Sequence, residues 1–318
     1  MKRRTRIART PHGRLLLGDC ADLLKKQRSG SVDLIVTSPP YGDNRRTTYQ
    51  GVKTGEYVTW FVPIARQMYR VLKDDGSLIL NVKERVIKGE RGTYVIELIL
   101  AMRQLGWRWT EEYVWTKKNS YPGKWPNRFR DAWERCLHFT KQRQFRMYQD
   151  EMKIPLGKWA ERRLANVRPY DLIRQTSAVG SPFGKKVANW IGKTHVYPTN
   201  VLNLATESRN RGHSATFPVS LPENFIRLFT CPGDTVLDPF IGSGTTALAA
   251  IGLERRYVGI EISADYFDLA AGRLLAFEHL QSNTDLSGGA PRKVAASRAD
   301  VGRRKTAIRR VAAARSRS

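Results

Sequence analysis

Length, composition and charge already exclude several classes of protein. The 318 residues can form one large α/β domain or a domain with an insertion, and the formal net charge of +26 favours a polyanionic partner, nucleic acid before a membrane surface. Three dispersed cysteines (Cys20, Cys136 and Cys231) argue against a disulfide framework and a structural zinc site, and no apolar stretch is long enough to span a bilayer. We expect a soluble, intracellular protein without a metal site.

The first half of the chain alternates between predicted strands and helices. After a basic arm at 1–13, we expect the following elements, in chain order: a strand at 14–17, a helix at 21–27, a buried strand at 31–37, a polar loop at 43–55, an amphipathic helix at 57–73 closed by Asp74-Asp75-Gly76, a strand at 77–82, a helix at 93–105, and strands at 109–116 and 135–140. Residues 14–140 therefore form half of a doubly wound, mostly parallel sheet.

The pattern changes at residue 141. From 141 to 210 apolar periodicity weakens and basic, aromatic and turn-forming residues mix, which predicts an inserted region with a nucleic-acid-facing surface or, alternatively, a solvated helical linker. The sheet resumes over 211–281, with a helix from Ser220 to Phe229, a strand at 234–238, a helix at 245–252, a strand at 257–262 and a helix at 264–279. Residues 282–318 are basic and poor in large apolar groups, which predicts a disordered tail.

The segment Ser38-Pro39-Pro40-Tyr41, at the end of the buried strand, is the first candidate site. Prolines cannot donate to a strand ladder and they restrict the preceding residue, so the strand ends in a rigid backbone. Ligands of open α/β sheets bind at such carboxyl ends. A seryl hydroxyl and a prolyl carbonyl could hold an exocyclic amino group there while the tyrosine ring stacks on the base, although a Pro-Pro pair can also simply end a strand.

The glycine-rich turn at 236–246 is the second candidate site. Gly242 and Gly244 belong to a G-x-G-x-x-G/A fingerprint, and Glu261 ends the next strand at a spacing suited to ribose hydroxyls. A nicotinamide dehydrogenase is disfavoured because Asp238 would repel a pyrophosphate and would rather attract an ammonium or sulfonium group. Too little chain follows for a complete dinucleotide domain, so the halves are circularly rearranged and both candidate sites are expected at neighbouring strand ends.

With these segments in this order, residues 14–278 resemble the S-adenosylmethionine-dependent DNA amino-methyltransferases of the permuted (β) order. The resemblance implies a Rossmann-like methyltransferase fold whose catalytic half (14–140) and cofactor-binding half (211–281) flank a target-recognition region (141–210). It implies S-adenosyl-L-methionine as cofactor, with Asp19 near the adenine and Glu261 at the ribose. The implied cofactor-binding residues are Asp19, Cys20, Asp238, Pro239, Phe240, Gly242, Ser243, Gly244, Thr245 and Glu261.

The same resemblance implies a double-stranded DNA partner, a flipped target base and catalysis by Ser38, Pro39, Pro40 and Tyr41. DNA contacts are expected from Arg45, Arg46, Lys117, Lys185 and Lys186, and residues 127–129 resemble a segment that flanks the base pocket. A serine before Pro-Pro favours cytosine N4 over adenine N6 as the target. A homodimer, a cognate restriction endonuclease and a prokaryotic, nucleoid-associated cytoplasmic location are further expectations. A basic DNA-binding protein on a degenerate methyltransferase scaffold is the alternative from another class.

Overall fold

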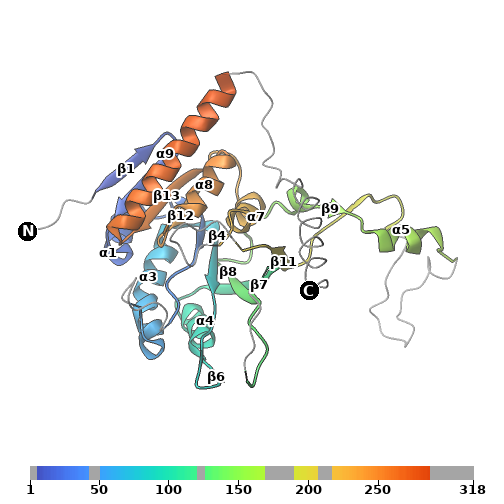
Figure 1. Cartoon of the computed structure of the whole chain (residues 1–318), viewed down its shortest axis with the longest axis horizontal. Coiled ribbons are helices and arrows are strands. Elements are labelled where there is room, and N and C mark those ends of the chain that lie inside the picture. Colours follow the sequence, from blue (N-terminus) through green and yellow to red (C-terminus); the bar gives the residue numbers. More distant parts are fainter. Residues whose placement is uncertain (1–5, 43–50, 120–125, 169–189, 207–216, 287–318) are drawn as a thin grey trace, which may run out of the picture. The chain divides into compact units, whose positions relative to one another are not determined.

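The computed structural model describes residues 6–42, 51–119, 126–168, 190–206 and 217–286 (Figure 1). The chain divides into a unit of residues 1–275 and a second unit, 276–318, of which residues 276–286 are described as the end of one helix. The helices in the described parts of the chain include none that is both long and apolar enough to cross a membrane.

A nine-stranded sheet organises the first unit, in the order β1-β2-β13-β12-β3-β4-β8-β7-β11. The strands β2, β13, β12, β3 and β4 are parallel, β8 runs antiparallel to both of its neighbours, and β11 pairs in parallel with β7. This confirms the mostly parallel α/β sheet. The strands are β1 (Ile7–Thr10), β2 (Gly13–Leu17), β3 (Val32–Thr37), β4 (Leu72–Val82), β7 (Arg108–Lys117), β8 (Trp133–Thr140), β11 (Val201–Leu204), β12 (Thr235–Asp238) and β13 (Arg256–Glu261).

Helices cover both faces of the sheet. On one face α3 (Tyr57–Val71) contacts α4 (Tyr94–Gln104) and α1 (Cys20–Leu23), and their apolar residues share a core with Leu137 and Phe139 of β8. On the other face α7 (Ser220–Phe229) contacts α8 (Thr245–Gly252), and its Phe229 packs against His138 with ring centroids 4.6 Å apart. Because side chains alternate along a strand, His138 and its two neighbours point to opposite faces. The sheet is therefore doubly wound, as expected.

Several element boundaries differ from the sequence prediction. The helix expected at 57–73 ends at Val71, because β4 begins at Leu72 and includes the Asp74-Asp75-Gly76 turn. The pairing with β3 shifts register there, and a Cβ at Gly76 would lie 2.7 Å from the Asp33 carbonyl oxygen. The helix expected at 21–27 is α1 followed by the 3₁₀ turn η1 (Leu24–Lys26). The segment predicted as an arm includes β1, at the edge of the sheet.

The region predicted as an insertion is connected to the sheet at both of its described ends. Its last described part includes β11, which no apolar alternation in the sequence had indicated. Its first residues contain Arg146, which forms ion pairs with Asp33, Asp75 and Asp234 at the amino ends of the central strands. Between these ends lie η3 (Gln149–Met152), the strand pair β9 (Ile154–Pro155) and β10 (His195–Val196), and α5 (Lys158–Ala165).

The remaining described elements flank α3, α4 and the end of the sheet. The turn η2 (Thr54–Glu56) precedes α3, and the hairpin of β5 (Val86–Ile87) and β6 (Glu90–Arg91) follows β4. The last helix, α9 (Ala264–Leu286), extends five residues into the stretch predicted as a disordered tail; the rest of that tail lies outside the described residues.

Candidate active site

The two segments that the sequence singled out lie at neighbouring strand ends. Strands β3 and β12 are parallel, with Ile35 opposite Leu237, so the residues that follow them emerge at the same edge of the sheet. The Thr37 hydroxyl donates a 2.6 Å hydrogen bond to Oδ1 of Asp238. This bond joins the residue before Ser38 to the residue that opens the glycine-rich turn, across 201 positions of sequence.

Asp238 holds this junction together. The Thr246 hydroxyl donates to its Oδ2 at 2.6 Å, and the amide of Phe240 donates to its Oδ1 at 3.0 Å, so with Thr37 three donors surround one buried carboxylate. Burial raises the pKa of Asp238 to about 6, and the three hydrogen bonds only partly oppose that shift. The sequence suggested a carboxylate that attracts a cationic group; the structure also gives it a function inside the protein, as the acceptor that fixes both candidate segments.

The glycine-rich turn has the open backbone that a close ligand approach requires. Gly242 and Gly244 have φ values of 54° and 88°, which favour glycine. A Cβ at Gly242 would meet only the Phe240 carbonyl oxygen, at 4.0 Å, whereas one at Gly244 would lie 3.3 Å from Ala270. Thr245 begins α8 and is buried, and Pro239 joins β12 to the turn. The Ser243 hydroxyl is buried and has no partner among the described residues.

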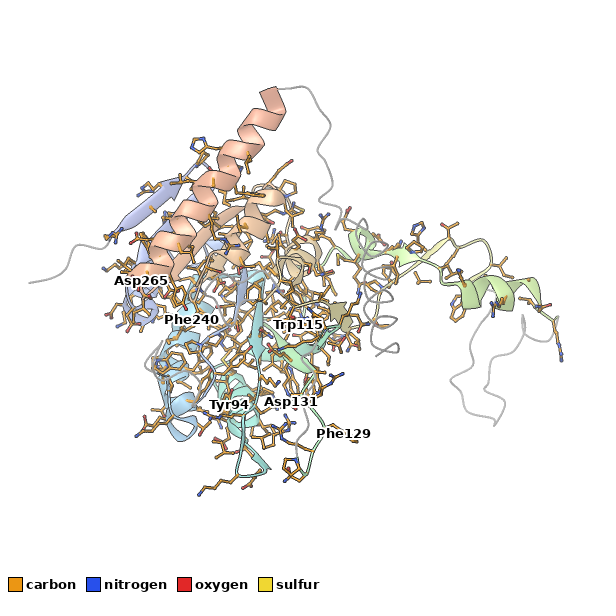
Figure 2. The ribbon with its side chains drawn as sticks, viewed as in Figure 1. Tyr94, Trp115, Phe129, Asp131, Phe240 and Asp265 are labelled. Atoms are coloured by element: carbon orange, nitrogen blue, oxygen red, sulfur yellow. The ribbon has the colours of Figure 1, made fainter. Side chains whose placement is uncertain are left out.

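Two acidic residues and an aromatic ring support this turn. Glu261, at the end of β13, accepts from the Gly242 amide at 2.9 Å and from the Ser263 amide at 2.9 Å. Burial raises the pKa of Glu261, although these amides oppose the effect. The Phe240 ring lies 5.8 Å from that of Trp60 on α3, and Figure 2 labels Phe240 beside this helix. The turn, which Asp238 opens, is thus held from both sides of the sheet edge.

The segment predicted near the adenine lies at the end of the next strand along. The Gly18 amide donates to the Glu261 carbonyl oxygen at 2.8 Å, which joins β2 to β13. Asp19 caps α1 by accepting from the Ala21 amide at 2.8 Å, and its side chain is exposed. Cys20 is buried, and burial raises the pKa of its thiol to about 12, so this sulfur is a thiol rather than a nucleophilic thiolate at neutral pH. The predicted cofactor-binding segments therefore all follow the carboxyl ends of parallel strands, on the same side of the sheet.

The proline motif is connected to strands β4, β7 and β8 through the Tyr41 hydroxyl. This oxygen lies 2.7 Å from Oε2 of Glu134, 3.1 Å from Oδ1 of Asn81 and 3.3 Å from the Ser38 hydroxyl. Glu134 in turn pairs with Lys117 at 2.5 Å. Burial, followed by the Glu134 charge, raises the pKa of Tyr41 well above its ordinary value, so the phenol stays protonated. The ring of Tyr41 is thereby fixed beside Ser38.

Sequence reasoning missed Glu134 and Asn81, and it described Lys117 as a DNA contact. Asn81 pairs with Cys136 of the antiparallel β8, and Glu134 precedes Cys136 by two residues in that strand, so both polar side chains are on the same face of the sheet. A carboxylate at the start of an apolar strand was the only available signal. The Lys117 ammonium is paired with Glu134 and lies 5.1 Å from the Trp115 ring centroid. Arg45, Arg46, Lys185 and Lys186 lie outside the described residues.

The loop that precedes β8 is charged and lies beside this site, where it contacts the β5–β6 hairpin through Arg91. Asp131 accepts from Arg91 at 3.0 Å and from Arg128 at 3.1 Å, and the Lys83 ammonium lies 3.8 Å away. Phe129, within the same loop, is 96% exposed and is drawn at the outer side of the ribbon in Figure 2. The loop is anchored through Asp131 while its phenylalanine stays accessible.

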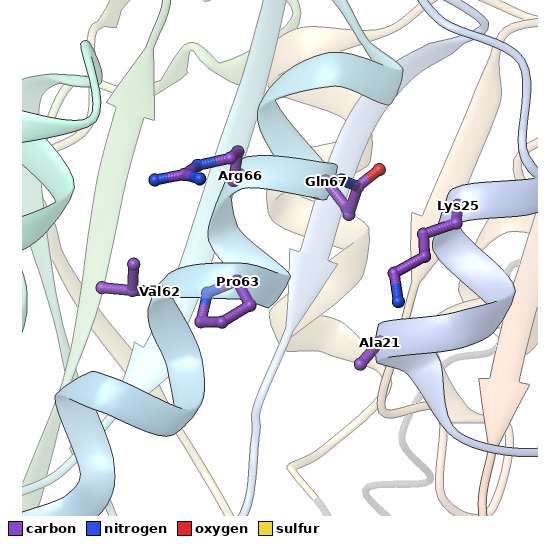
Figure 3. Close-up of a pocket in the computed structure, with 6 residues that line it drawn as sticks. All are labelled: Ala21, Lys25, Val62, Pro63, Arg66 and Gln67. Carbon is purple, nitrogen blue, oxygen red and sulfur yellow. The ribbon is translucent and has the colours of Figure 1, made fainter.

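One pocket of the structure lies away from these residues (Figure 3). It is a depression between the α1–η1 segment and the side of α3, and the predicted site residues contribute nothing to its lining. It is therefore not the candidate site. Its lining residues are Ala21, Lys25, Val62, Pro63, Arg66 and Gln67. Within the part of the chain that the structure describes, no cluster of three or more His, Cys, Asp or Glu side chains could hold a metal ion.

Comparison with known proteins agrees with this geometry. The type II methyltransferase M.PvuII of Proteus hauseri is 29% identical over 289 residues, which cover 84% of each chain. The solved PvuII DNA methyltransferase (cytosine-N4-specific) superposes with a TM-score of 0.63 at 25% identity, covering 88% of this chain and 94% of that one. The protein TTHA0409 of Thermus thermophilus, solved in complex with S-adenosyl-L-methionine, shares the fold with a TM-score of 0.54 at 22% identity, over 82% of this chain and 92% of that one.

A family model described as DNA methylase, of the N6/N4 type, matches residues 32–272, which include the proline motif, the glycine-rich turn and all the central strands except β2. The match covers well over half of the chain. The neighbouring strands β3 and β12 bring both motifs to the same edge of the sheet. The chain therefore belongs to the N6/N4 family of DNA methylases.

Proposed function

We propose that this protein is a site-specific DNA methyltransferase that transfers a methyl group from S-adenosyl-L-methionine to the N4 amine of a flipped cytosine. The observation that supports it most directly is the Thr37–Asp238 hydrogen bond, which brings Ser38 next to the glycine-rich turn. The serine before Pro-Pro and the similarity to the PvuII enzyme, whose structure is described as cytosine-N4-specific, favour cytosine over the alternative, adenine N6.

The residues at the sheet edge fit S-adenosyl-L-methionine. Each carboxylate oxygen of Glu261 accepts one amide and keeps a lone pair, which suits ribose hydroxyls. Gly242 leaves open space for a ligand, and the unpartnered Ser243 hydroxyl can bond one. Asp19 and the buried Cys20 would border the adenine, while Asp238, Pro239, Phe240, Gly244 and Thr245 would border the methionine part. When bound, the cofactor supplies a methyl group on a cationic sulfur.

The protein's own groups would then prepare the amine. Its lone pair is conjugated with the base, so it is a poor nucleophile until hydrogen-bond acceptors orient it. Ser38 Oγ and the Pro39 carbonyl oxygen are two acceptors on a rigid backbone, and the Tyr41 ring, fixed through its hydroxyl, provides the stacking surface. Holding the amine in line with the methyl group would supply much of the acceleration.

The DNA itself would approach over the same edge of the sheet. A net charge of +26 gives strong, salt-dependent attraction to phosphates, and the amine must leave the duplex stack to reach Ser38. The proposal includes DNA contacts from Arg45, Arg46, Lys117, Lys185 and Lys186 and a role of residues 141–210 in recognition. It also includes a homodimer, a restriction partner for the same site and a cytoplasmic, nucleoid-associated location.

Product analysis tests the proposal. Plasmid DNA is incubated with the protein and isotope-labelled S-adenosyl-L-methionine, digested to nucleosides and analysed by mass spectrometry, with Ser38→Ala as the inactive control. We expect labelled N4-methylcytosine from the wild-type protein alone. Labelled N6-methyladenine would instead establish the alternative base. Cofactor binding by calorimetry without any DNA methylation would favour the non-catalytic DNA-binding scaffold.

A further inference from the structure

Methylation of an amine leaves a proton that must be removed, and the structure indicates where it goes. We propose that Ser38 and Tyr41 form a hydroxyl relay that delivers this proton to Glu134, the buried carboxylate at the start of β8. The proposal rests on the proposed function, because it concerns the amine held at Ser38. Glu134 touches neither substrate nor cofactor in this scheme and acts only through Tyr41.

The direction of the hydrogen bonds supports the relay. The Tyr41 hydroxyl has a single proton and faces two acceptors, the Asn81 side-chain oxygen at 3.1 Å and the Glu134 carboxylate at 2.7 Å. The Asn81 amide group donates to the Arg135 carbonyl oxygen, which fixes its oxygen toward Tyr41. Tyr41 therefore donates to the nearer and charged acceptor, and it can only accept from Ser38. Ser38 in turn donates its proton to Tyr41 and presents lone pairs to the substrate.

Each step of the relay balances. The methylated amine is a cation, and its N–H bond breaks as a bond forms between that proton and Ser38 Oγ. The original Ser38 proton moves to Tyr41 Oη, and the original Tyr41 proton moves to Glu134, which becomes a neutral carboxylic acid. No redox change occurs, and both hydroxyls are regenerated. Tyr41 never has to exist as a phenolate, which agrees with a pKa that desolvation and the Glu134 charge raise well above the ordinary value.

The surroundings of Glu134 suit a terminal acceptor. The Lys117 ammonium lies 2.5 Å from Oε1 and leaves Oε2 for Tyr41, so the two carboxylate oxygens have separate partners. The Lys117 side chain is 20% exposed, against 8% for the Glu134 side chain, so solvent reaches the lysine more than the carboxylate. The nearby carboxylates of Glu84 and Glu112 are instead bonded to Arg135, at 2.7 Å and 2.6 Å.

Single-turnover kinetics of Glu134→Gln test the relay, with DNA and cofactor dissociation constants measured alongside. Glutamine keeps an oxygen that can accept from Tyr41 but cannot take up the proton. We expect the rate constant for methyl transfer to fall by about 10²- to 10⁴-fold, the range for loss of proton transfer to a positioned group, while both dissociation constants stay within about threefold. Glu112→Gln is the matched control on the adjacent strand β7, and it should leave the rate constant nearly unchanged.

A double-variant cycle separates the relay from independent packing effects. If Tyr41 and Glu134 act in one path, Tyr41→Phe combined with Glu134→Gln is no slower than the slower single variant. The relay would be overturned if the double variant slowed methyl transfer by the product of the two single effects. A Glu134→Gln rate constant within about threefold of wild type would also overturn it. Absence of methylation by the wild-type protein would instead overturn the proposed function, so the two failures are distinguishable.

Discussion

Replacement of Asp238 by alanine should damage both folding and cofactor binding, because this carboxylate accepts from the Thr37 hydroxyl, the Thr246 hydroxyl and the Phe240 amide. Alanine leaves those three donors without their acceptor at a site where Asp238 is only 2% exposed. A buried donor that loses its partner costs about 1–3 kcal/mol. Three such donors amount to about 3–9 kcal/mol. Relaxation of the two threonine hydroxyls and the removal of a buried charge offset part of this cost, so we expect the free energy of unfolding to fall by about 3–5 kcal/mol.

Asparagine at the same position distinguishes the charge from the hydrogen bonds. Burial raises the pKa of Asp238 from 3.8 to about 6, so ionisation is less favourable in the folded protein than in the unfolded chain. That difference of about two pKa units corresponds to about 3 kcal/mol at neutral pH. The charge itself therefore opposes folding, and a neutral amide that keeps one acceptor oxygen should lose no more than about 2 kcal/mol. A cationic cofactor should nevertheless bind Asp238→Asn more weakly than wild type.

Thermal unfolding with and without S-adenosyl-L-methionine, together with calorimetric titration, measures both effects. At about 2–4 °C per kcal/mol for a chain of this size, Asp238→Ala should melt about 6–20 °C lower than wild type, and Asp238→Asn should melt at most about 8 °C lower. Equal melting temperatures for the two variants would refute the argument from hydrogen bonds. Wild-type cofactor affinity in both would refute the assignment of Asp238 to the cofactor site.

Further predictions concern pH and three other positions. As pH rises from about 4 through 6, ionisation of Asp238 should lower the unfolding free energy of the cofactor-free protein by about 3 kcal/mol, and urea titrations across this range should show that the Asn variant lacks this component. Arg146→Ala should lower the unfolding free energy in urea by about 1–3 kcal/mol, since it removes one charged partner of the buried Asp33, which keeps Lys73 and the Thr235 amide; an unchanged midpoint would contradict this. Gly259→Ala places a Cβ 2.6 Å from a Leu15 methyl and 3.0 Å from Ile241, so overpacking of about 1–3 kcal/mol and weaker cofactor binding are expected by calorimetry. Phe129→Ala should weaken DNA binding about 5- to 100-fold in fluorescence anisotropy if the exposed ring stacks on bases, with cofactor affinity as the internal control.

Local patterns in the sequence determined most of the sheet and both candidate segments. The β-branched run of β3, the amphipathic spacing of α3 and the glycines after β12 are short-range signals, and the structure contains each of these elements close to its expected bounds. The sequence also predicted that strands from both sides of the insertion share one sheet, and β12 and β13 indeed pair with β3 and β2. These features depend on residues that are neighbours in the chain.

Contacts between distant residues were decided only by the tertiary structure. Apart from the carboxylate at the start of β8, the sequence held no signal for Glu134 and Asn81, because their importance comes from facing Tyr41 across two strands that are far apart in sequence. Strand β11 forms because it adds to the edge of β7, not because its own residues alternate strongly. Asp238 was predicted from its motif, yet the raised pKa and the bond to Thr37 arise from burial between two strands. The sequence therefore predicted the two motifs, while packing of the sheet determined which side chains connect them.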